Sequence, residues 1–240
     1  MVYIDADKLD QTILNQKIRL QQGDMCLERC LGQRFIAAGR SEGRVEIHGV
    51  PGNALGAYLN GAEIEVMGNA QDAVGDTMNA GRIVIHGCIG DTAGYAMRGG
   101  EIYVEGNAGY RAGIHMKAYQ DKLPAIVIGG RAGSFLGEYQ AGGMIVVLGL
   151  HLDGASIVSN YPCTGMHGGK LFLRSDCKGI LFPKQVSARP ATQEDMEEVT
   201  PYLKQYADLF GCDYDYIRNS PFTVVVPDSR NPYRQMYVAN

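Results

Sequence analysis

The sequence predicts an all-β solenoid, a parallel β-helix of about seven coils with short helical caps at both ends. Three observations predict it: an excess of glycine (32 of 240 residues), a 19-residue internal repeat, and alternation of apolar and polar residues within each repeat. A repeat of this length suits one coil made of a strand, a turn and a second short extended piece. Successive coils stack about 4.8 Å apart, so each structural requirement recurs with the same period.

Glycine recurs in two columns with the 19-residue spacing, interrupted by one insertion of five residues. The first column is Gly49, Gly68, Gly87, Gly106, Gly130 and Gly149, and the second is Gly56, Gly75, Gly94, Gly113 and Gly137. Glycine adopts a positive φ without a Cβ clash, so we expect these residues to form the corners of successive coils. Geometry rather than phosphate binding then explains most of the glycine, and the sequence has no Walker-type phosphate loop.

Two apolar columns with the same period mark the inward positions of the strands. The first is Val45, Ile64, Ile83, Ile102, Ile126, Ile145 and Leu171, and the second is Ile47, Val66, Ile85, Val104, Ile128, Val147 and Leu173. Alternation of this kind indicates strands with one buried face. Extra residues interrupt the repeat within Lys117–Pro124 and Asn160–Gly168. Insertions in solenoids usually gather on one face, where they can be functional.

The N-terminal end lies outside the clear repeats, and we assign residues 1–24 to a helical cap. Within it, Asp7–Gln22 is predicted to be a helix that Asp5 or Asp7 caps and Gly23 ends. The residues expected on its apolar face are Leu9, Ile13 and Leu20. Such a cap would cover a terminal coil, which otherwise exposes apolar core and an unpaired edge.

The β-helix is assigned to residues 25–182, and a C-terminal helix with an extended tail to residues 183–240. Proline and capping signals predict the elements of this second end. In order, they are a linker at Pro183–Pro190, a helix start at Thr192 with Asp195 completing a capping box, a second helix from Pro201 to Gly211, and a strand at Phe222–Val226.

The residue between the two inward columns should face outward, and its character changes along the stack. The first two such residues, Glu46 and Glu65, are charged, and the later ones are apolar or aromatic. These later residues, called the outer stripe below, are Val84, Tyr103, Val127, Val146 and Phe172. An exposed apolar stripe needs a cover, so these residues are a candidate interface. The chain's own C-terminal segment and another protein both remain open as the cover.

Composition excludes several classes of function. Lys+Arg 22 against Asp+Glu 26 gives a net charge of −4, so nothing suggests the basic patch of a nucleic-acid binder. No apolar run is long enough to span a membrane, and Met1–Asp5 does not resemble a signal peptide. The six cysteines are then expected to be reduced thiols in a cytoplasmic protein.

Few residues suggest chemistry, and no catalytic, cofactor-binding or metal-ligating residue is assigned. Cys163 and His167 lie four residues apart in one insertion and are a candidate reactive pair, because imidazole can activate a thiol. His48 and His86 share one column but lie two coils apart, too far to share a metal within one chain. A trimeric β-helix enzyme with a zinc site of histidines between subunits remains an alternative, and a homo-oligomer is possible.

The glycine motifs resemble a known family. Met97-Arg98-Gly99-Gly100, Gln140-Ala141-Gly142-Gly143 and Met166-His167-Gly168-Gly169 each precede a predicted strand. Together with Gly68–Ala70 and Gly90–Gly94, they resemble the glycine-repeat (GXGXG) C-terminal domain of the glutamate synthase large subunit, in a stand-alone form. The resemblance covers roughly residues 25–175, and the two ends are similar to those of stand-alone versions.

The resemblance implies a right-handed parallel β-helix that serves as a scaffold and carries no catalytic residue. In glutamate synthase an amidotransferase domain hydrolyses glutamine, and a domain with FMN and an iron–sulfur cluster uses the ammonia. The expected partners are therefore glutamine amidotransferase and FMN-binding synthase subunits, with FMN and the cluster in those partners. This sequence departs from the whole enzyme, because residue 2 is Val instead of a nucleophilic Cys and cluster cysteines are absent.

The same domain occurs in N-methylglutamate synthase and as one of the subunits of formylmethanofuran dehydrogenase. The motif therefore predicts a component of an oxidoreductase complex without choosing among these complexes. A formylmethanofuran-type role stays open beside a role in nitrogen metabolism and glutamate biosynthesis.

Overall fold

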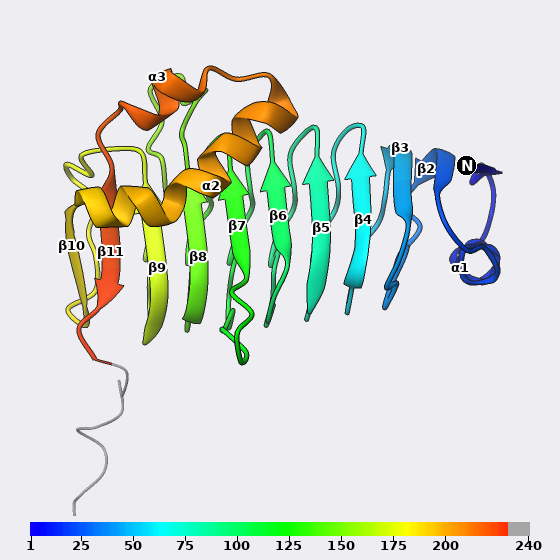
Figure 1. The fold of residues 1–240 in the computed structure, drawn as a ribbon, viewed down its shortest axis with the longest axis horizontal. Helices are drawn as coiled ribbons and strands as arrows, with labels where there is room; N and C mark the ends of the chain where they lie inside the picture. Colours follow the sequence, from blue (N-terminus) through cyan, green and yellow to red (C-terminus); the bar gives the residue numbers. More distant parts are fainter. Residues whose placement is uncertain (230–240) are drawn as a thin grey trace, which may run out of the picture.

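In the computed structural model, which describes residues 1–229, the chain forms a stack of parallel strands with helices at one end and across one face (Figure 1). One 11-stranded sheet has the order β1-β2-β3-β4-β5-β6-β7-β8-β9-β11-β10. The strands are β1 (Val2–Asp5), β2 (Met25–Leu31), β3 (Arg44–Val50), β4 (Asn60–Val66), β5 (Ala80–Ile85), β6 (Glu101–Val104), β7 (Ala125–Ile128), β8 (Ala141–Val147), β9 (Gly168–Leu173), β10 (Val186–Pro190) and β11 (Thr223–Pro227). The helices are α1 (Gln11–Leu20), α2 (Gln193–Phe210) and α3 (Tyr214–Arg218).

Residues of the same predicted column are paired with one another on neighbouring strands of the sheet. Val45 pairs with Ile64, Ile64 with Ile83, and the pairing continues at the 19-residue spacing through β6. Both inward columns are almost fully buried, and they form the long core of the solenoid with Leu55, Met78 and their equivalents. The predicted all-β solenoid is confirmed, with about eight turns instead of seven.

The additional turn comes from the N-terminal end. Strand β2 pairs in parallel with β3 and forms a full coil, which the sequence marks only weakly. Strand β1 adds one more parallel strand inside the region assigned to the helical cap. The predicted helix there is shorter than expected: α1 begins after its cap Asp10 and ends at Leu20. The buried residues of α1 are Leu14 and Ile18, so the prediction that Ile13 and Leu20 lie on the apolar face was wrong. Leu9, just before the helix, does pack against the core.

The two glycine columns have different causes. The second column has φ values of +62° to +71°, and each Cβ would also point into the core; at Gly94 it would lie 2.4 Å from Cδ1 of Ile126. In the first column, Gly87, Gly106 and Gly130 have no positive φ, so the predicted cause was wrong for these positions. There the backbone of the preceding coil passes too close for a side chain, and a Cβ at Gly87 would lie 2.7 Å from the carbonyl carbon of Gly68.

The C-terminal region departs from the prediction in two places. The expected linker contains β10, which pairs antiparallel with β11, and β11 pairs antiparallel with β9. Helix α2 is continuous from Gln193, and exposed Pro201 lies inside it instead of starting a second helix. Proline removes one backbone donor, a loss that water can compensate on an exposed side. The capping box and the left-handed Gly211 at the end are confirmed, while residues 230–240 of the predicted tail lie outside the described residues.

Candidate functional site

The outer stripe is covered by the chain's own helix α2, which crosses the green strands in Figure 1. Tyr103 is 1% exposed, and Val127, Val146 and Phe172 are fully buried. They belong to a second hydrophobic cluster to which α2 and the segment after it contribute Val199, Leu203, Tyr206, Ile217 and Phe222. Val84, 4% exposed, lies beside Leu209 of α2. The stripe is therefore corrected from a candidate interface to an internal contact of the fold.

Polar contacts of two α2 residues, Tyr206 and Asp195, fix the position of the helix on the sheet. The Tyr206 hydroxyl donates a hydrogen bond to the carbonyl oxygen of Glu105, with 3.2 Å between the oxygens. It reaches this carbonyl because the nearest residue of the next coil is Gly129, where a Cβ would lie 1.8 Å from the hydroxyl oxygen. Burial, with smaller effects of Cys212 and Glu105, raises the pKa of Tyr206, so the hydroxyl stays a donor at neutral pH.

The start of α2 is held by Asp195, which is 3% exposed. Its carboxylate caps the helix with Thr192 and accepts hydrogen bonds from Lys170 of β9 (3.1 Å) and Arg189 of β10 (2.5 Å). Burial alone would raise the pKa of this carboxyl. The hydrogen bonds from Arg189, Thr192 and Lys170 outweigh burial and hold the pKa well below the ordinary 3.8.

We expect Asp195→Asn to lower the free energy of unfolding at pH 7 by about 2 kcal/mol, because charged hydrogen bonds are lost with little change of shape. A lowered pKa stabilises the fold above the ordinary value of 3.8, and this contribution is lost as pH falls further. The difference between wild type and variant should thus shrink below about pH 4. Urea unfolding at several pH values measures it; a constant difference down to pH 2 would contradict this role of Asp195.

A groove of about 1000 Å³ lies between α2 and the beginnings of strands β6, β8 and β9. This volume is in the range of ligand sites in proteins. Both insertions border it: Ala118 and Leu123 come from the first, and His167 from the second. Four glycines contribute backbone to its lining: Gly142, Gly143, Gly168 and Gly169. The expectation that the insertions gather on one face therefore holds for these three residues.

The polar side chains of the groove are largely paired with one another. Tyr103 donates a hydrogen bond to Glu101 (3.0 Å), and Lys170 pairs with Glu198 (2.5 Å). Burial, and then the charges of Glu101 and Glu198, raise the pKa of Tyr202. On the rim of the groove, Leu123 is an apolar side chain that is 60% exposed. The groove is better suited to holding a molecule or a segment of a partner than to acid–base chemistry.

The candidate reactive pair is separated by the fold. Cys163 is fully buried in the solenoid core, and burial raises the pKa of its thiol to about 12. His167 lines the groove on the outside, where its Nδ1 lies 3.0 Å from the carbonyl oxygen of Gly165. A thiol in this environment stays protonated at neutral pH, so the proposed Cys–His nucleophile is wrong. All six cysteines are free.

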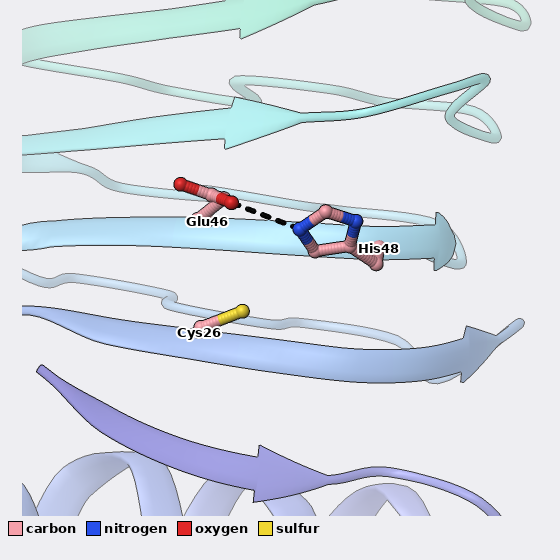
Figure 2. Close-up of side chains that lie close together, drawn as sticks. All are labelled: Cys26, Glu46 and His48. Atoms are coloured by element: carbon pink, nitrogen blue, oxygen red, sulfur yellow. Dashed lines mark hydrogen bonds and ion pairs between the residues drawn. The ribbon is translucent and has the colours of Figure 1, made fainter.

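One group of metal-ligand type lies outside the groove (Figure 2). Cys26 of β2 and Glu46 of β3 are register partners, and His48 is two residues further along β3. Their Sγ, carboxylate oxygen and imidazole nitrogen all lie within 4.8 Å of one another. The 20-residue separation of Cys26 and Glu46 differs from the regular repeat, so the sequence spacing did not reveal the group. His48 and His86 remain separate, because His86 contacts Glu65 instead (2.8 Å).

The glycine pairs that precede strands have a common geometry. The second glycine of each pair is left-handed, with φ of +83° at Gly100, +75° at Gly143 and +78° at Gly169. The first faces the preceding coil, so that a Cβ at Gly168 would lie 2.3 Å from the carbonyl oxygen of Ala141. A positive φ at the second glycine and close approach of the preceding coil at the first therefore recur at the same place in different coils.

None of the helices within residues 1–229 is long and apolar enough to cross a membrane.

The fold and the groove define a class: parallel β-solenoid proteins with glycine pairs at their coil corners and a helix across the outer face. The chain belongs to the GXGXG motif family, whose model matches residues 10–227. It is 43% identical over 250 residues to the uncharacterized protein MJ1350 of Methanocaldococcus jannaschii, covering 98% of this chain and 96% of that protein.

A chain in the crystal structure of the formyltransferase/hydrolase complex (FhcABCD) of Methylorubrum extorquens has a similar fold. The TM-score is 0.61, with coverage of 92% of this chain and 89% of that one. That complex was crystallised with methylofuran. The sequence identity is 18%, so this similarity concerns the fold.

Proposed function

We propose that this chain is a non-catalytic scaffold subunit of a multi-subunit enzyme complex of the glutamate synthase type. Separate subunits would provide the glutamine amidotransferase and the FMN- and iron–sulfur-containing oxidoreductase, and this chain would hold no cofactor of theirs. The observation that carries the proposal is the family match over residues 10–227, which spans the solenoid, α2 and the groove. The buried Cys163 thiol and the paired charges of the groove support a role in binding rather than catalysis.

A second candidate is a subunit of a formyl-transferring complex. One observation favours it: the matched fold in the Methylorubrum extorquens complex works as one chain of a formyltransferase/hydrolase assembly. Both candidates place the solenoid in an assembly, and they differ in the chemistry of its partners. The glycine motif is common to both types of complex. The glutamate synthase type is placed first because the second candidate depends on a fold similarity at 18% sequence identity.

Purification of the tagged chain from cells of its source, followed by mass spectrometry, tests the proposal. We expect amidotransferase and FMN-binding proteins to co-purify, and the isolated chain to show no flavin absorbance. Formyl-transferring partners would instead support the second candidate. Release of ammonia from glutamine by the isolated chain, or recovery of the chain without any stoichiometric partner, would contradict a scaffold role.

The rim of the groove offers a matched pair of variants for the same experiment. Leu123 is 60% exposed beside the groove, and Leu20 is 82% exposed on α1 at the other end of the solenoid. We expect Leu123→Asp to weaken complex formation by about tenfold or more, as truncation of an interface anchor does. Leu20→Asp should have no effect, and circular dichroism should show both variants folded. Equal binding by the two variants would exclude this part of the groove from the interface.

A further inference from the structure

We infer that Cys26, Glu46 and His48 form a binding site for a zinc ion on the outer face of the first coils. The three residues belong to neighbouring strands, and their side chains lie on the same side of the sheet (Figure 2). They provide one sulfur, one nitrogen and one oxygen donor, all within 4.8 Å of one another. This site is independent of the groove and of the proposed complex.

The geometry is close to what zinc requires. In a tetrahedral zinc site with bonds of about 2.0–2.3 Å, neighbouring donor atoms lie roughly 3.5 Å apart. Nε2 of His48 and Oε1 of Glu46 are 2.8 Å apart, and the sulfur of Cys26 completes the group within 4.8 Å. Small rotations of side chains thus suffice to seat an ion. Thiolate, imidazole and carboxylate together favour zinc over the harder magnesium and calcium ions.

Neighbouring side chains contact two of the three groups and orient them. Cys26 is 2% exposed although it lies on the outer face, and its thiol is within 3.5 Å of the Glu28 carboxylate. The guanidinium of Arg44 lies 3.4 Å from Oε2 of Glu46, the oxygen that His48 does not contact. Oε1 is therefore left facing the imidazole and the thiol. Three protein ligands also leave the fourth position of a tetrahedral ion open.

Zinc is bound by the thiolate form of Cys26, so binding is coupled to loss of the thiol proton. A zinc ion displaces the thiol proton and compensates the neighbouring carboxylates in the same step. Binding therefore releases one proton from the thiol to solvent, and no oxidation or reduction takes place.

The chain contains its own control for this site. His86 lies two coils further along and contacts Glu65 at 2.8 Å, the same distance as between His48 and Glu46. The residues in register with Glu65 on the two neighbouring strands are Glu46 of β3 and Val84 of β5, so neither provides a thiol. A histidine–glutamate contact thus occurs at both places, but only the proposed site also has a cysteine, Cys26.

Titration of the full chain with zinc chloride after EDTA treatment tests the inference. We expect one zinc per chain, and an affinity more than about 100-fold weaker in Cys26→Ser and in His48→Gln, because each variant loses a direct ligand. His86→Gln should bind zinc as the wild type does. With cobalt(II) as the probe, the wild type and His86→Gln should show thiolate-to-metal charge-transfer absorption, which Cys26→Ser should lack.

Two results would overturn the site. One is the absence of stoichiometric zinc binding by the wild type. The other is equal zinc affinity in Cys26→Ser, His48→Gln and the wild type, with all three folded by circular dichroism. The His48 side chain is 40% exposed, so its replacement should leave the fold intact even if Cys26→Ser disturbs packing.

Discussion

Val146→Asp should unfold the isolated chain or lower its free energy of unfolding by about 4 kcal/mol or more. Val146 is fully buried in the second hydrophobic cluster, between the sheet and α2, where its neighbours are apolar side chains. A carboxylate without a partner in such a place loses its hydration, and it relieves this cost only by taking up a proton. The destabilisation should therefore be smaller at pH 4 than at pH 7.

Urea unfolding of the purified chain measures this effect, with Val2→Asp as the matched control. Val2 lies in β1 and is 37% exposed, so the same substitution there should change the free energy by no more than about 0.5 kcal/mol. The result also tests what covers the outer stripe. An unchanged stability of Val146→Asp, with loss of binding to a partner, would mean that another protein and not α2 covers it.

Gly87→Val should prevent folding to the native solenoid, at a cost above about 4 kcal/mol. A Cβ at this position would lie 2.5 Å from Oδ1 of Asn69 and 2.7 Å from the carbonyl carbon of Gly68. The backbone of the preceding coil cannot move away without separating the two coils. Gly87→Ala should cause much of this loss of folding free energy, since the Cβ atom alone produces the overlap.

Gly154→Ala is the control that separates crowding from backbone strain. Gly154 has a φ of +83° and nothing within 4 Å of a new Cβ, so its replacement adds strain without contact. That strain should cost about 1–2 kcal/mol, and the chain should still fold. Thermal unfolding followed by circular dichroism compares the variants. Equal stabilities of Gly87→Ala and Gly154→Ala would refute close approach of the coils as the reason for glycine at 87.

The repeating part of the fold could be predicted from the sequence, because each coil imposes the same requirements on the next. The pairing of Val45, Ile64 and Ile83 is an example, and the apolar period alone gives it. Strand β1 could not be found in this way, since four residues of one strand contain no repeat. The outward positions also depend on a long-range contact: Val146 needs α2, which lies about 50 residues further along the chain.

The candidate sites were less predictable, because they too depend on contacts between residues that are distant in sequence. Cys163 and His167 are neighbours in sequence, but the turn sends one side chain into the core and the other outward. Cys26 and His48 are distant in sequence, and the register of β2 and β3 brings them together. Motif spacing reports on chemistry within one turn or strand, whereas side chains on neighbouring coils meet only after the register is known.

The position of α2 has a consequence for synthesis of the protein on the ribosome. The coils from β6 to β9 can stack as they emerge, but their outer stripe stays uncovered until the last residues of α2 have been made. The delay between Leu173 and Phe210 is about 2–7 seconds at typical rates of translation. During this interval the nascent chain presents an apolar strip to the cell, and it is then most exposed to chaperones and to aggregation.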